Sequence, residues 1–347
     1  MKCYSLACQR YYTCESGCKN SIKIQNLYKG ERKMKKKSLV LLLAFAMIFT
    51  FVLGACGKSD SAEEPTEETT ATDDVAAAYN NLLEEIGEPE NPDGQLVVAT
   101  SPDFAPMEFV DLSREGDDQY VGFDILLAKS LAVELNKELV IKPMSFDAVM
   151  AAVQTGSVDV GLSGFSWTEE RSQNYYLTRW YEAGENESDQ TIITTKANEG
   201  KFSSAEDFAG YKVGAQVGSL QKILVEENLT DSEMVLYDNL NDACTALLAG
   251  KIDALAVAKG NGEAFVSANP DDLVQTGFLF EIDELYKNNV AMLNKDNAEL
   301  GEQINAILDQ QEADGVWDTW YEACQLLAEI KTIDELGYDD QGNKITE

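Results

Sequence analysis

The chain has 347 residues, enough for two domains, and 44% of them are hydrophobic, so it can form a sizeable core. It contains no histidine, which excludes histidine-dependent catalytic triads and zinc-protease motifs, and we expect neither a cofactor nor a metal. The segment before Cys56 holds 10 of the 27 basic residues and 2 of the 61 acidic ones, so the rest has a net charge of −42. Such acidity repels phosphate backbones, which argues against nucleic acid as a partner.

Residues 34–55 have the pattern of a secretory signal peptide. Three lysines precede a 15-residue run from Leu39 to Leu53 that is apolar except for Thr50, and small residues then lead to Cys56. The run is shorter than the roughly 20 residues that a helix needs to cross a bilayer. The string Leu53-Gly54-Ala55-Cys56 resembles the lipobox, at which bacteria lipidate a cysteine. We therefore expect Cys56 to be the lipidated N-terminus of the mature protein.

Residues 1–33 are unusual because a polar segment stands in front of the signal peptide. We predict that they are not translated and that synthesis starts at Met34, since Lys29-Gly30-Glu31 can be encoded by a purine-rich ribosome-binding sequence. The alternative is a metal site formed by the segment's cysteines, but these lack the paired CxxC spacing of such sites. They are Cys3, Cys8, Cys14 and Cys18.

Residues 56–94 are predicted to be an acidic tether that carries one short helix. Ser, Glu, Thr and Asp dominate the stretch from Lys58 to Asp74, which has almost nothing to bury. Apolar residues then recur at helical spacing from Val75 to Ile86. The loop that follows, 88–94, is rich in proline and acidic residues.

From Gln95 onward, short apolar runs alternate with helical patterns, which is typical of an α/β fold with mostly parallel strands. In the first such unit we expect strands at 96–99, 140–141 and 158–162 and helices at 124–135 and 147–154, with Asp124 as a helix cap. In the second unit we expect strands at 212–216, 234–237 and 252–257 and helices at 219–227 and 242–249. Two α/β lobes place a cleft between them, where such sheets bind ligands.

Several motifs occur in the order and at the spacing of the polar amino-acid-binding proteins of ABC importers, solute-binding protein family 3, which the chain resembles over about 230 residues. They are Leu96-Val97-Val98-Ala99-Thr100, Phe104-Ala105-Pro106-Met107-Glu108-Phe109, Val121-Gly122-Phe123-Asp124-Ile125, Ser163-Gly164-Phe165-Ser166-Trp167-Thr168-Glu169-Glu170-Arg171 and Ala313-Asp314-Gly315-Val316-Trp317-Asp318.

This resemblance implies a periplasmic-binding-protein-like (type II) fold whose lobes are joined by a two-segment hinge. The crossings would be Thr191 to Thr195 and Asn288 to Met292. Lobe one would then comprise 95–192 and 290–330, lobe two 193–289, and 331–347 a C-terminal tail. The protein would be a monomer on the outer face of the cytoplasmic membrane, held by lipid on Cys56, that delivers an amino-acid-like molecule to an ABC permease.

The resemblance also implies a set of ligand-binding residues. Arg171 would hold the ligand's α-carboxylate, because a planar guanidinium can donate two parallel hydrogen bonds to it. The turn at Ser219 and Leu220 begins a helix whose unpaired amides favour an anion. Two aromatic residues would sandwich the ligand's side chain, and further contacts would come from the strand ends and loops nearby. These residues are Phe104, Phe146, Ser163, Gly164, Ser166 and Gln216.

The sequence departs from the family at Ala258. An aspartate that pairs with the ligand's α-ammonium is expected there, and burying an ammonium without an acid is costly. Either the ligand has no free α-ammonium or another carboxylate replaces the aspartate. The candidate acids are Glu108, Glu185, Glu187 and Asp189.

Two other functions stay open at this point. An enzyme of the lyase or dehydratase type on the same scaffold would use a carboxylate in the cleft as acid or base. A ligand-sensing ectodomain would need a separate membrane partner. The signal peptide, tether and binding motifs favour a transport receptor.

Overall fold

A computed structural model describes residues 67–181 and 189–329. The predicted signal peptide, Cys56, the first residues of the tether and the tail at 331–347 lie outside the described residues, as do Glu185 and Glu187. Cys244 and Cys324 are both buried and unpaired, and they belong to different hydrophobic cores, so they form no disulfide.

The first sheet has the strand order β5-β1-β6-β13-β7. Strand β1 runs parallel to β5 and β6, whereas β13 runs antiparallel to β6 and β7. The strands of this sheet are β1 (Gln95–Thr100), β5 (Glu138–Pro143), β6 (Val160–Gly161), β7 (Tyr176–Leu177) and β13 (Met292–Leu293). A small antiparallel sheet beside it contains β2 (Asp103–Phe104), β3 (Glu108–Val110) and β4 (Tyr120–Val121).

The second sheet, with the order β10-β9-β11-β8-β12, is built in the same way. Strand β9 pairs in parallel with β10 and β11, and β8 is antiparallel to β11 and β12. In both sheets, therefore, three parallel strands are extended by an antiparallel strand. The strands are β8 (Gln190–Thr195), β9 (Lys212–Gln216), β10 (Glu233–Tyr237), β11 (Ala254–Ala258) and β12 (Leu273–Leu279).

The expected two-lobed α/β fold is thus confirmed, but the segment expected as the first crossing, Thr191 to Thr195, is a strand of lobe two. All of β8 is paired within the second sheet. The physical reason is the unbroken ladder between β8 and β11. The return crossing follows the expectation more closely, because Asn289 bridges to Ser166 and Tyr181 in lobe one just before β13 begins.

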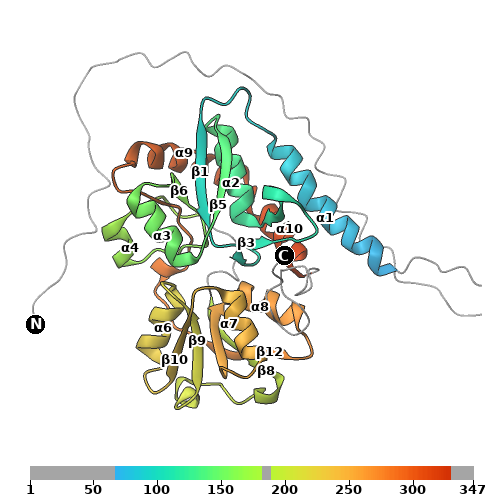
Figure 1. The fold of residues 1–347 in the computed structure, drawn as a ribbon, viewed down its shortest axis with the longest axis vertical. Coiled ribbons are helices and arrows are strands. Elements are labelled where there is room, and N and C mark those ends of the chain that lie inside the picture. Colours follow the sequence, from blue (N-terminus) through green and yellow to red (C-terminus); the bar gives the residue numbers. More distant parts are fainter. Residues whose placement is uncertain (1–66, 182–188, 330–347) are drawn as a thin grey trace, which may run out of the picture. The chain divides into compact units, whose positions relative to one another are not determined.

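Helices cover both faces of each sheet, which explains the continuous apolar runs in the strands. In β1, Leu96 and Val98 belong to one hydrophobic core, whereas Ala99 and the partly buried Val97 belong to another on the opposite face. The helices of lobe one are α2 (Phe123–Glu134), α3 (Phe146–Thr155), α4 (Glu169–Asn174), α9 (Ala298–Asp314) and α10 (Trp317–Glu329), and those of lobe two are α6 (Leu220–Asn228), α7 (Leu240–Leu248) and α8 (Lys259–Ala268) (Figure 1).

The predicted short helix is longer than expected and is part of lobe one. Helix α1 (Glu67–Ile86) begins eight residues before Val75 and packs against α2 and α10. Tyr79 is fully buried, and its hydroxyl accepts a hydrogen bond from the backbone N–H of Gly122 at 3.0 Å. Residues 75–86 are therefore no free tether, because burial of this apolar face attaches them to the lobe.

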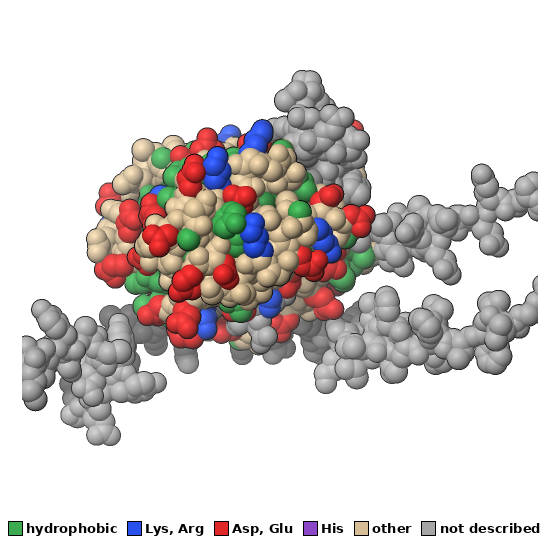
Figure 2. Space-filling model, turned by 90° about the horizontal axis from the view of Figure 1, so that it is seen from below, with side chains coloured by type: hydrophobic (Ala, Val, Ile, Leu, Met, Phe, Trp, Pro, Cys, Tyr) green, Lys and Arg blue, Asp and Glu red, His purple; other side chains and the backbone are tan. Residues whose placement is uncertain are grey.

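The surface agrees with a dispersed acidic shell. In Figure 2 the Asp and Glu side chains are spread over the visible face with a few lysines and arginines between them. Among the described residues, no helix combines the length and apolar character that a membrane span requires. The same part of the chain has no cluster of His, Cys, Asp and Glu suited to a metal ion.

Candidate functional site: a cleft around a buried arginine

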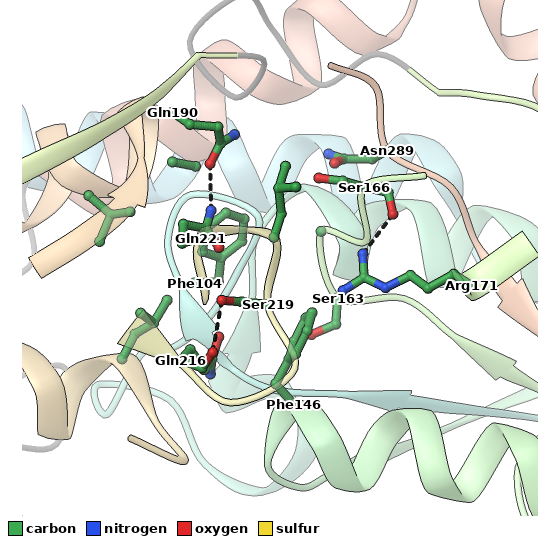
Figure 3. A pocket seen from close by; sticks show the side chains of 15 residues that line it. Phe104, Phe146, Ser163, Ser166, Arg171, Gln190, Gln216, Ser219, Gln221 and Asn289 are labelled. Atoms are coloured by element: carbon green, nitrogen blue, oxygen red, sulfur yellow. Dashed lines mark hydrogen bonds between the residues drawn. The ribbon is translucent and has the colours of Figure 1, made fainter. Parts of the chain in front are cut away.

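A pocket between the two sheets receives residues from both lobes (Figure 3). Its volume of about 20 Å³ is enough for a water molecule but not for an amino acid. All ten residues predicted to bind the ligand line it. They are Phe104, Phe146, Ser163, Gly164, Ser166, Arg171, Gln216, Ser219, Leu220 and Ala258.

Arg171 is the one charged side chain in the described pocket lining. It lies in α4 and is only 5% exposed, and burial lowers its pKa to about 10. Its guanidinium donates to the backbone oxygens of Ser166 at 2.6 Å and of Gly218 at 3.0 Å, and it stacks over the rings of Phe146 and Phe165. None of the ion pairs found among the described residues includes Arg171. A buried cation without an acidic partner is costly, so the site favours an anion.

The N-terminus of α6 adds further donors from lobe two. Ser219 is the N-cap, and its hydroxyl oxygen accepts a hydrogen bond from the N–H of Lys222 at 3.1 Å. The same hydroxyl donates to the backbone oxygen of Gln216. The first two amides of the helix, at Leu220 and Gln221, have no carbonyl partner within the helix. Together with the helix dipole they favour a carboxylate.

Two buried acids hold the wall that lobe one contributes. Asp124 was expected to cap its helix, but the N-cap is Gly122, and the carboxylate instead accepts from the N–H of Gly164 at 2.8 Å and the hydroxyl of Tyr181 at 2.9 Å. Burial raises the pKa of Asp124 to about 6. Glu108 accepts from the hydroxyl of Ser163 at 2.7 Å. These acids fix the loop that carries Ser163 and Gly164.

A third buried acid, Asp103, joins the lobes behind the pocket. One carboxylate oxygen accepts from the N–H of Leu240 at 2.6 Å and from the side-chain amide of Gln216 at 2.9 Å, both in lobe two. The other accepts from Ser101 at 2.8 Å. Burial raises the pKa of Asp103 to about 6. Through its bonds to Gln216 and to the N-terminus of α7, Asp103 connects lobe one to lobe two.

Residues 96–323 match the sequence profile of the bacterial extracellular solute-binding proteins, family 3, about two thirds of the chain. The chain belongs to this family.

The relatives of this receptor include proteins named for amino acids. It is 27% identical over 277 residues to the arginine-binding extracellular protein ArtP of Bacillus subtilis (strain 168), covering 79% of this chain and 93% of that protein. It is 28% identical to the L-cystine-binding protein TcyJ of Escherichia coli (strain K12), covering 64% and 79%.

Solved structures of the same kind match over most of the two-lobed region. The amino acid ABC transporter substrate-binding protein AbpA of Streptococcus pneumoniae, bound to L-arginine, gives a TM-score of 0.63 at 34% identity and covers 69% of this chain and 97% of that one. An ancestral arginine-binding protein bound to glutamine gives a TM-score of 0.59 at 33% identity, covering 66% and 96%. The receptor therefore has the periplasmic-binding-protein-like fold that the sequence predicts.

Five residues of the solute-binding cleft were not predicted. Gln190 lies at the start of β8 and Asn289 in the return crossing, and each contributes an amide to the pocket. The side-chain amide of Gln221 donates to the oxygen of Gln190 at 2.5 Å. In the sequence, Gln190 and Asn289 could have been found as polar residues at or next to the two predicted crossings. The five are Gln190, Gln221, Leu240, Val257 and Asn289.

Ala258 lies where the sequence departs from the family, at the end of β11, and its methyl group faces the cleft of this receptor. None of the described candidate acids lines the pocket. Glu108 is engaged with Ser163, and Asp189 has its carboxylate 3.9 Å from the ammonium of Lys259 with the side chain 44% exposed. The other two candidates lie outside the described residues. Within the described lining, therefore, no carboxylate replaces the missing aspartate.

Proposed function

We propose that this family 3 receptor captures a small amino-acid-like carboxylate between its lobes and delivers it to an ABC permease. One observation carries the proposal: the buried guanidinium of Arg171 has no acidic partner among the described residues and faces the N-terminus of α6. In that position a ligand carboxylate supplies the missing negative charge. Relatives named for arginine and cystine, and solved relatives with arginine bound, support this ligand class.

Binding in this scheme closes the two lobes around the ligand. Lobe one supplies Arg171 and lobe two supplies the α6 amides, so the carboxylate joins them when it contacts both. The bonds from Asp103 to Leu240 and Gln216 connect the lobes in the same closed state. Hinge closure of this kind hides the ligand and gives a permease a distinct surface to recognise. A smaller radius of gyration in solution scattering with ligand is the expected result.

A binding role fits the pocket better than catalysis. The described lining offers hydroxyls, amides and one guanidinium, whereas a lyase needs a carboxylate or another base in contact with its substrate. The buried acids Asp103, Asp124 and Glu108 accept hydrogen bonds from the protein itself.

The membrane attachment is proposed from the sequence alone. The signal peptide and the lipobox-like string before Cys56 favour a lipid anchor on the outer face of the cytoplasmic membrane. Residues 56–66 would then connect the lipid to α1, and 11 residues extend to at most about 35–40 Å. A permease in the same membrane lies within this reach.

Thermal unfolding of the domain with a panel of amino acids and related carboxylates tests the proposed function. A ligand at 100 times its dissociation constant stabilises the protein by about 2.7 kcal/mol, which is readily measured. We expect at least one carboxylate to raise the unfolding midpoint of the wild type. If no carboxylate does so while an uncharged or cationic solute does, the proposal is wrong.

A further inference from the structure

We infer that the ligand carries, beside its carboxylate, an uncharged hydrogen-bond donor in place of a free α-ammonium, as in an N-acylated amino acid or a 2-hydroxy acid. The inference rests on the proposed function and names the substrate class of the same cleft. It is argued from the uncharged surroundings of Ala258, from the partners of Asp103 and Asp189, and from the side-chain amide of Gln216.

The position of the missing acid is well defined. Ala258 ends the parallel strand β11, precedes α8 and is 2% exposed, and its side chain is a methyl group in the pocket wall. The register pairs it with Gln190 on β8. An ammonium placed here would meet an apolar surface and a neutral amide, and burying an ammonium on such terms is unfavourable.

Among the described residues, two acids lie close to the cleft, and both have partners within the protein. Asp103 lies behind Gln216 and accepts three hydrogen bonds, from Ser101, Leu240 and Gln216. Asp189, next to Gln190, has its carboxylate 3.9 Å from the ammonium of Lys259, and its backbone oxygen accepts the backbone N–H of that residue at 2.9 Å. Neither carboxylate lines the pocket, so neither is placed to neutralise an ammonium.

Gln216 offers a neutral acceptor instead. Its side-chain nitrogen donates to the carboxylate of Asp103 at 2.9 Å and to the backbone oxygen of Asp238 at 3.4 Å, which uses both amide hydrogens. A carboxylate accepts but does not donate, so this contact fixes the orientation of the amide. The amide oxygen of Gln216 is then the group left for a ligand. It suits a neutral N–H or O–H, which costs far less to bury than an ammonium.

The size of the site points the same way. Alanine at position 258 has a smaller side chain than the expected aspartate, so it leaves more room for a ligand next to Val257 in the same pocket wall when the lobes separate. An acyl group on the ligand's nitrogen is apolar enough to occupy this space. The carboxylate of the ligand would still face Arg171 and the amides at the start of α6.

Calorimetric titration of matched compounds provides the test. The wild-type domain is titrated with the 20 common L-amino acids, with their N-acetyl derivatives and with the available 2-hydroxy analogues. We expect at least one N-acetyl or 2-hydroxy compound to bind 10-fold or more tightly than its parent amino acid, roughly 1.4 kcal/mol. If every parent amino acid that binds is tighter than its derivatives, the inference is overturned and the proposed function stands. If no compound of either class binds, both fall.

Two variants at position 258 separate charge from size. Ala258→Asp restores the acid. The affinity for the parent amino acids, relative to that for their derivatives, should therefore be 10-fold or more higher in this variant than in the wild type. Ala258→Asn has almost the same size without the charge, so it should weaken both classes and keep their order. An unchanged order in a folded Ala258→Asp domain contradicts the inference. Should this variant fail to fold, the wild-type ratio decides the matter alone.

Discussion

Replacement of Arg171 by methionine removes the guanidinium but keeps a long, unbranched side chain in the same cavity. Burial lowers the pKa of Arg171 to about 10, which corresponds to about 3 kcal/mol of unfavourable desolvation at 1.36 kcal/mol per pKa unit. The variant recovers this energy but loses two charged hydrogen bonds, to Ser166 and Gly218, worth about 1.5–3 kcal/mol each. The two effects largely offset each other, so the free energy of unfolding of the ligand-free protein should fall by no more than about 3 kcal/mol.

The effect on binding should be larger than the effect on folding. Loss of a buried, charged donor pair to a ligand carboxylate costs about 2–5 kcal/mol, a decrease in affinity of about 30-fold to several thousand-fold. Arg179→Met is a matched control, because Arg179 also belongs to lobe one but does not line the pocket. Its guanidinium forms ion pairs with Asp309 and Glu312, each with an N···O distance of 2.5 Å. That variant should bind the ligand as the wild type does.

Denaturant unfolding of the three proteins, with and without the tightest-binding compound of the panel, separates the two effects. In the wild type and in Arg179→Met the ligand should stabilise the fold, and in Arg171→Met it should not. The reasoning is refuted if Arg171→Met is destabilised by more than 3 kcal/mol and still gains the full stabilisation from the ligand. Arg171 would then be a structural residue.

Three further predictions concern the pocket wall, the buried acids and the membrane anchor. Gly164→Ala should lower ligand affinity at least 10-fold by calorimetry, because a Cβ there would lie 2.6 Å from the ring of Phe104; unchanged affinity would contradict this contact. Burial raises the pKa of Asp103, so its contribution to stability is present below about pH 4 and is lost as the pH rises through about 6. Scanning calorimetry should therefore show that the free energy of unfolding of Asp103→Asn falls less steeply over this pH range than that of the wild type. The pH dependence due to Asp124 should remain. An equal slope in the two proteins would contradict the prediction. Intact-mass analysis of membrane-extracted protein should show an acylated chain beginning at Cys56, and an unmodified chain that retains the signal peptide would exclude the anchor.

The sequence alone determined the fold class and most of the cleft. Apolar runs such as Ala254–Val257 predict strands buried on both faces, and the two faces of β11 do belong to different cores. Arg171, Phe146 and Ser219 could be found because the stretches of sequence around them resemble those of family 3 in order and spacing. Local order along the chain is sufficient for such residues.

Only the tertiary structure decided which other side chains reach the same pocket. Gln190 and Asn289 are about 100 residues apart in the chain, and the packing of the two lobes brings them to the same pocket. Asp124 was misjudged as a cap for the same reason, since its partner Gly164 comes from another element. Helix α1 could be predicted from its periodicity, but its docking could not, because the bond from Tyr79 to the backbone joins residues 43 positions apart. Periodicity shows that a side chain is to be buried, whereas the partner that it meets depends on how distant segments pack.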